Sequence, residues 1–80
     1  MLADLLRAAR RFDEAAGLYR ELLRERPDDL HHWPSLVECL ARAGRRTEAL
    51  LAREEALGIL DRAPGDHAVL RRRLAGIDLR

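Results

Sequence analysis

The stretch from Leu30 to Ala49, LHHWPSLVECLARAGRRTEA, decides the fold, because it contains one helix, the stop that ends it and the start of a second helix. Its apolar residues recur at helical spacing and form one stripe about 120° wide. The stripe comprises Leu30, Trp33, Leu36, Val37 and Leu40. Gly44 tolerates the left-handed conformation that closes a helix, and Thr47 offers an N-cap for the next one. The stretch predicts a helix-turn-helix hairpin.

The composition of the whole chain favours helices in one small domain. It has 80 residues, of which 48% are hydrophobic and only 5 are Gly and 3 are Pro, so helices meet few interruptions. We therefore expect an all-α fold and a single domain over residues 1–80. Every basic residue is Arg, a bias typical of a GC-rich bacterial gene, and the net charge of +1 does not call for nucleic acid.

The periodicity predicts five helices along the chain. The first spans residues 1–9, and the second is capped by Asp13 and ends at or just before Arg26. The third is capped by Asp28 or Asp29 and stops at Gly44. The fourth begins at Thr47 and ends before Pro64, and the fifth runs from Asp66 to about Gly76.

An internal repeat relates the first two hairpins at an offset of 34 residues. The identical pairs are Leu2/Leu36, Leu6/Leu40, Ala9/Ala43, Arg11/Arg45, Glu14/Glu48, Ala15/Ala49, Glu21/Glu55 and Leu23/Leu57. We expect Ala15 and Ala49 to lie where paired helices approach most closely, and Trp33 to be a buried anchor. Pro27 and Pro64 are 37 residues apart, which gives the fourth helix three extra residues.

This 34-residue unit resembles the tetratricopeptide repeat family. The second unit has Trp33-x-x-Leu36, Gly44 and Ala49, and the first has Ala15-x-x-x-Tyr19 and Pro27; Val37, Leu40, Arg53 and Pro64 depart from the family pattern. The resemblance implies antiparallel hairpins stacked as a short α-solenoid of about two degenerate repeats. The first unit, residues 1–27, has a truncated opening helix; the second covers residues 28–65, and a closing helix covers residues 66–80. The RAGRRTEAL segment is also similar to a helical domain of some bacterial transcriptional activators.

The resemblance further implies a groove, lined by the first helix of each pair, that binds a peptide or protein. His31, Ser35, Glu38 and Arg42 share one helix face. The predicted groove residues are Asp4, Arg7, His31, Ser35, Glu38, Arg42, Arg71 and Arg72. We expect mixed charge that turns positive toward the C-terminus and prefers a partner with an acidic segment. The family's carboxylate clamp uses Lys and Asn, which this chain lacks.

Enzymatic, metal and cofactor sites are not predicted. His31, Ser35 and Glu38 lie along one straight helix and do not supply the converging geometry of nucleophilic catalysis. His31, His32, His67 and Cys39 form no paired metal motif. A lone cysteine and the lack of any apolar run of about 18 residues indicate a cytoplasmic, non-membrane protein.

Several alternatives to a peptide-binding scaffold stay open. Exposed Leu2, Leu5 and Leu6 would suit self-association, as a homo-oligomer, or docking within a larger assembly. The run Arg71 to Arg73 suits a solvated surface better than nucleic acid, because it has no interleaved aromatic residues. The chain would also suit a fragment of a transcriptional regulator built from such repeats. The sequence does not identify the partner.

Overall fold

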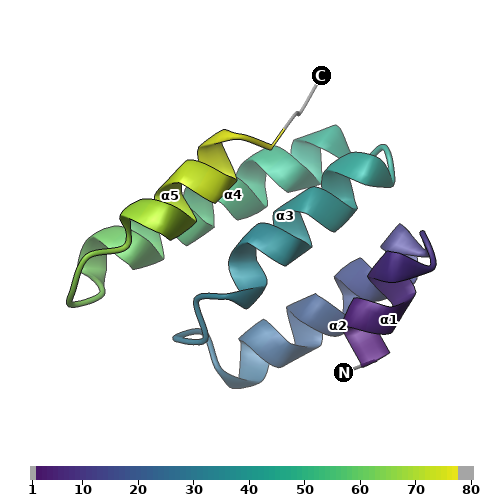
Figure 1. Ribbon diagram of the computed structural model, residues 1–80, viewed down its shortest axis with the longest axis horizontal. Coiled ribbons are helices and arrows are strands. Elements are labelled where there is room, and N and C mark those ends of the chain that lie inside the picture. The colour runs from purple at the N-terminus through teal and green to yellow at the C-terminus, as the bar shows by residue number, and fades with distance from the viewer. Residues whose placement is uncertain (1, 78–80) are drawn as a thin grey trace.

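The computed structural model describes residues 2–77 and is all-α, as predicted (Figure 1). Within that range the helices are α1 (Leu2–Ala8), α2 (Phe12–Glu25), α3 (His32–Arg42), α4 (Arg46–Arg62) and α5 (Ala68–Ala75). Met1 and residues 78–80 of the predicted first and closing units lie outside the described residues. The helix α4 has 17 residues against 14 in α2, which confirms the three extra residues inferred from the prolines.

The turns that close α1 and α3 have the same hydrogen bonds, 34 residues apart. After α3, the N–H of Arg45 donates to the carbonyl of Leu40 at 2.9 Å, and that of Gly44 to Ala41 at 3.2 Å. After α1, Arg11 donates to Leu6 at 2.8 Å and Arg10 to Arg7 at 3.0 Å. Both are Schellman turns, which satisfy the last carbonyls of a helix and need one left-handed residue. The stop predicted at Gly44 is confirmed by its φ of 80°.

The predicted capping side chains are wrong for α2, α3 and α4. The N-cap residues are Arg11, His31 and Arg45, and none makes a side-chain capping hydrogen bond. The Schellman turns explain where α2 and α4 begin. The residue that completes each turn is already the N-cap of the next helix, so Asp13 and Thr47 lie inside the helices. In α3, two further turn residues follow Asp29, which instead lies 3.2 Å from His32 Nε2. At α5, Asp66 accepts the Ala68 N–H at 3.0 Å, two residues before the helix begins.

The core surrounds α3, the central helix, which packs between α2 and α4 and also against α5. The fully buried side chains include Tyr19, Leu40 and Leu74. Ala15 and Ala49 are also fully buried, as expected where helices approach closely. Trp33 is buried, as predicted, and its Nε1 donates to the carbonyl of Pro27 at 3.3 Å.

The helices form two layers. In Figure 1, α1, α3 and α5 lie toward the viewer, while α2 and α4 lie behind them. On the rear layer, Arg20 Nη2 of α2 lies 3.0 Å from Glu48 Oε2 of α4, and Arg45 Nε lies 3.0 Å from Asp13 Oδ1. These ion pairs connect α2 with α4, the second helices of the two hairpins. The surface of the front layer is separate from them.

Candidate functional site

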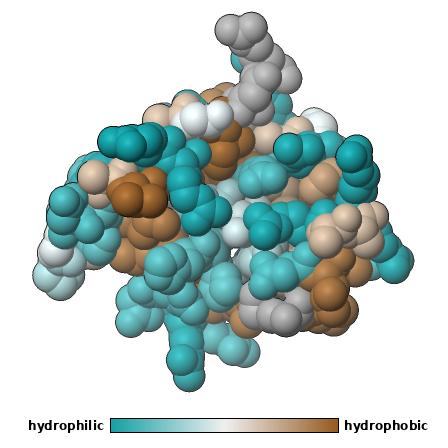
Figure 2. Space-filling view, viewed as in Figure 1, coloured by the Kyte–Doolittle hydropathy of each residue, from teal (hydrophilic) through white to brown (hydrophobic). Residues whose placement is uncertain are grey.

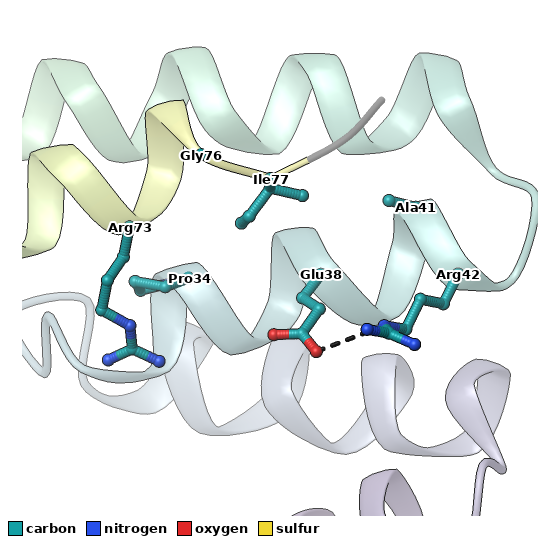
Figure 3. A pocket seen from close by; sticks show the side chains of 7 residues that line it. All are labelled: Pro34, Glu38, Ala41, Arg42, Arg73, Gly76 and Ile77. Carbon is teal, nitrogen blue, oxygen red and sulfur yellow. Dashed lines mark ion pairs between the residues drawn. The ribbon is translucent and has the colours of Figure 1, made fainter. Parts of the chain in front are cut away.

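Two hollows on the front layer share a ridge made by Glu38 and Arg42 of α3. The larger has a volume of about 700 Å³ and lies between α3 and the end of α5 (Figure 3). It is lined by Pro34, Glu38, Ala41, Arg42, Arg73, Gly76 and Ile77. The smaller, of about 310 Å³, lies between α1 and α3 and is lined by Asp4, Arg7, Ala8, Arg10, Phe12, Glu38 and Arg42. We call the two hollows and their ridge the groove.

The ridge is fixed by contacts on both of its sides. Arg42 Nε lies 3.3 Å from Glu38 Oε1, one helical turn away on α3 (Figure 3). On the other side, Arg7 Nη1 of α1 lies 3.9 Å from Glu38 Oε2. The Arg42 guanidinium also sits 5.6 Å from the centroid of the Phe12 ring, a cation–π distance. The carboxylate of Glu38 is therefore held between two arginines, and Phe12 supports one of them.

The second acid of the groove, Asp4, is held by a buried tyrosine. The Tyr19 hydroxyl donates a hydrogen bond to Asp4 Oδ1. This hydrogen bond lowers the pKa of Asp4, and the nearby Arg7 acts in the same direction. Burial, followed by the hydrogen bond to Asp4, raises the pKa of Tyr19 to about 12. Asp4 is thus ionised and already engaged within the chain at neutral pH.

The groove carries more positive than negative charge. Four arginines line it, against two acids that the chain itself already engages. Among the described residues, no acid forms an ion pair with Arg10 or Arg73. Arg10 lines the smaller hollow and Arg73 the larger. Within residues 2–77, an arginine without an acidic partner therefore lies at each end of the groove.

Four of the predicted groove residues come together in this groove. Asp4, Arg7, Glu38 and Arg42 line it from α1 and α3. The helical spacing of Glu38 and Arg42 places them on one open strip of α3, as predicted.

The other four lie elsewhere. His31 lines a different hollow, beside the loops that precede α3 and α5. Ser35 is only 7% exposed, because α3 is covered by neighbouring helices on most of its circumference. Arg71 forms an ion pair with Asp61 of α4, which turns it away from the groove. Arg72 is exposed and lines neither hollow.

Sequence reasoning missed Arg73, Arg10 and Phe12. Arg73 lies on the other flank of the buried Leu70 and Leu74 from Arg71, and helical spacing alone does not tell which flank faces α3. Phe12 precedes the N-cap that was expected at Asp13, but it is the first residue of α2, and its ring supports Arg42. The repeat offset aligns Arg10 with Gly44 at the left-handed turn position, but it gives no signal that the Arg10 side chain lines a hollow.

The described chain also has a hollow outside the groove and its front layer. A hollow of about 560 Å³ lies between α2 and α4, on the side away from the groove, with Arg24 and Leu51 among its lining residues. Within residues 2–77, no group of three or more His, Cys, Asp or Glu is placed to hold a metal ion. None of the five helices is both long and apolar enough to cross a membrane.

Comparison with known families agrees with the paired hairpins and their matching turns. The sequence model of the tetratricopeptide repeat matches residues 1–67, which include α1 to α4. The chain belongs to the tetratricopeptide repeat family. No curated protein and no solved structure matches the sequence. Tetratricopeptide repeats generally mediate contacts between proteins and are typically scaffolds without catalytic activity.

Proposed function

We propose that this tetratricopeptide repeat protein is a non-enzymatic binding module whose groove holds an acidic segment of a partner protein. The observation that carries the proposal is the charge balance of the groove. Both of its acids are engaged by groups of the chain, whereas Arg10 and Arg73 pair with no described acid. Such arginines bind an anionic side chain most strongly, because guanidinium and carboxylate groups match in charge and geometry.

The residues that line the larger hollow indicate which side chains the partner carries beside its acid. Pro34, Ala41 and Ile77 supply apolar surface beside the guanidinium groups of Arg42 and Arg73 (Figure 3). This combination suits a segment in which an apolar side chain adjoins an Asp or Glu, because apolar burial supplies affinity while the ion pairs fix orientation. Glu38 on the ridge would repel an acid placed between the two hollows. The partner's acids are therefore separated, one at each end of the groove.

The cellular setting that we propose is the bacterial cytoplasm, where a scaffold of this kind would act. The lone Cys39 is buried and free, and burial raises the pKa of its thiol to about 11. Its thiolate, the form that reacts, is therefore rare at neutral pH. Cys39 serves packing in this proposal and takes no part in binding.

A peptide selection tests the proposed binding. Random peptides displayed on phage are enriched on the immobilised chain, and the dissociation constants of enriched peptides are measured by fluorescence anisotropy. We expect enrichment of Asp and Glu next to an apolar residue. The Arg73→Glu substitution should weaken these peptides about fivefold or more, because it replaces an attraction at the groove with a repulsion.

The matched control is Arg24→Glu, which makes the same charge change in the hollow on the opposite side. It should leave the affinity within about twofold of the parent, since charges far apart are screened by salt. Enriched peptides that lack acids, or that lose more affinity with Arg24→Glu than with Arg73→Glu, would disprove the proposed groove.

A further inference from the structure

Glu38 lies in the middle of the groove, with an arginine on each side of its carboxylate. It lines both hollows. Its Oε1 lies 3.3 Å from Arg42 Nε on the same helix, and its Oε2 lies 3.9 Å from Arg7 Nη1 on α1. A carboxylate between two guanidinium groups is also the arrangement that would bind an acid of a partner. Within the chain itself, Glu38 therefore occupies the position of a ligand.

The two arginines are held only loosely by Glu38. Both distances exceed the length of a close ion pair, which is about 2.7–2.9 Å, and each guanidinium has further N–H groups to donate. The side chains are also partly exposed: Arg42 by 57%, Arg7 by 33% and Glu38 by 34%. An acid of a partner can therefore reach both guanidinium groups, and it competes there with Glu38.

Other contacts hold the two arginines at the ridge independently of Glu38. Arg7 Nη2 lies 3.9 Å from Asp4 Oδ1, and the Arg42 guanidinium sits 5.6 Å from the centroid of the Phe12 ring. Glu38 is the one acid among residues 2–77 that forms an ion pair with Arg42. If Glu38 lost its charge, both guanidinium groups would stay in place, and Arg42 would have no acidic partner in the described chain.

A partner that fills both hollows must cross the ridge between them. Figure 2 shows mainly hydrophilic side chains over the middle of this face, between α1 and α5. Acids at the two ends of the segment are attracted by Arg10 and Arg73. An acid in the middle meets Glu38 instead, and like charges at close range repel. A run of consecutive acids should therefore bind less tightly than acids that are set apart.

We infer that Glu38 determines which acidic segments the groove accepts, because its carboxylate occupies an anion-binding position that Arg7 and Arg42 form together. The inference rests on the proposed function and adds the residue that discriminates between partners. Segments with spaced acids are accepted, and continuous acidic runs are rejected by repulsion from Glu38. Removal of this one charge would open the position between the two arginines to an acid of the partner.

Glu38→Gln is the test variant, because it removes the charge and keeps the length of the side chain. Circular dichroism and the fluorescence of Trp33 check that the fold is retained. Glu48→Gln is the matched control. Glu48 Oε2 also lies between two arginines, 3.0 Å from Arg20 Nη2 and 3.6 Å from Arg45 Nη1, but on α4 and outside the groove. The control variant therefore loses the same charge without changing the ridge.

The peptide selection is repeated on the parent and both variants, and each enriched peptide is compared by fluorescence anisotropy with a filled derivative, in which Glu replaces the residues between its acids. The parent and Glu48→Gln should select separated acids, and filling should weaken binding about threefold or more. Glu38→Gln should also select continuous acidic runs and bind filled peptides at least as tightly as the originals. Adding Arg7→Gln to Glu38→Gln should remove this gain, because the central acid then loses one of its two arginines.

The possible results separate this inference from the proposed function. Filled peptides that bind the parent and Glu38→Gln equally well would overturn the inference alone, and so would a Glu48→Gln variant that gains acidic runs as Glu38→Gln does. Acidic peptides enriched only by Glu38→Gln would support the anion-binding position but disprove the proposed function of the parent. If neither chain enriched acidic peptides, both the inference and the proposed function would be wrong.

Discussion

Arg10 adopts the left-handed backbone conformation, with φ of 62°, at the position where Gly44 has φ of 80° one repeat later. The same pair of turn hydrogen bonds surrounds both residues. A residue with a Cβ atom is strained in the left-handed conformation, at a cost of roughly 1–2 kcal/mol per residue in a left-handed helix. Gly has no Cβ atom and is not strained there. The first turn is therefore strained at Arg10, whereas the equivalent turn after α3 is unstrained at Gly44.

We predict that Arg10→Gly stabilises the protein and Gly44→Ala destabilises it, each by about 1 kcal/mol. Urea unfolding followed by circular dichroism measures both changes. Arg10→Asn serves as a control for the lost charge, because Asn tolerates the left-handed conformation better than Arg. If Arg10→Gly and Arg10→Asn both unfold more easily than the parent, the turn is not where the strain lies.

Alkaline pH should destabilise the fold through Tyr19. The pKa of its hydroxyl is about 12 in the folded chain against an ordinary value of 10.0, so the folded state holds more protons than the unfolded state between these values. The free energy of unfolding therefore falls as pH rises from about 10 to about 12. Tyr19→Phe should flatten this part of the pH dependence, as measured by urea unfolding at a series of pH values.

Asp4→Asn tests the hydrogen bond to Asp4, which raises the pKa of Tyr19 less than burial does. Tyr19 is the only tyrosine, so the ultraviolet absorbance of tyrosinate after a rapid pH jump reports its pKa alone. We expect the pKa to move down in Asp4→Asn yet remain above the ordinary value, because burial is the larger cause. A pKa that does not change would show that Asp4 and Tyr19 are not hydrogen bonded in solution.

Ala15→Leu and Ala49→Leu should each destabilise the fold by about 1–3 kcal/mol, because a larger side chain overpacks a site with no free space. Both alanines are fully buried. Ala75→Leu, at an exposed position of α5, is the matched control and should change stability little. Thermal melts measure all three, and parental melting of both core variants would contradict the close helix packing.

Trp33 should fluoresce at short wavelength and resist quenching by acrylamide, because its ring is buried and its Nε1 donates to the Pro27 carbonyl. It is the only tryptophan, so the emission belongs to it. Trp33→Phe keeps an aromatic ring but loses the hydrogen bond, which should cost about 1 kcal/mol or more with the lost volume. Red-shifted, readily quenched emission from the folded parent would place Trp33 on the surface.

The sequence by itself determined the helices, the stop at Gly44 and the extra length of α4. These features depend on local chemistry: helical periodicity of apolar residues, the conformational freedom of Gly and the place of Pro27 and Pro64. The repeat offset also found the close helix packing at Ala15 and Ala49, because small residues recur where helices cross. Local signals failed at the helix starts, where the shared Schellman turns, and not Asp13 or Thr47, set the first residue.

Only the tertiary structure decided which polar residues share a surface. Ser35 has the spacing of the groove residues on its helix, yet neighbouring helices bury it. Arg71 and Arg73 flank the same buried stripe, and the ion pair with Asp61 takes Arg71 toward α4 while Arg73 lines the groove. Helical spacing fixes the angle of a side chain about its own axis, but the neighbour that it meets depends on how separate helices pack.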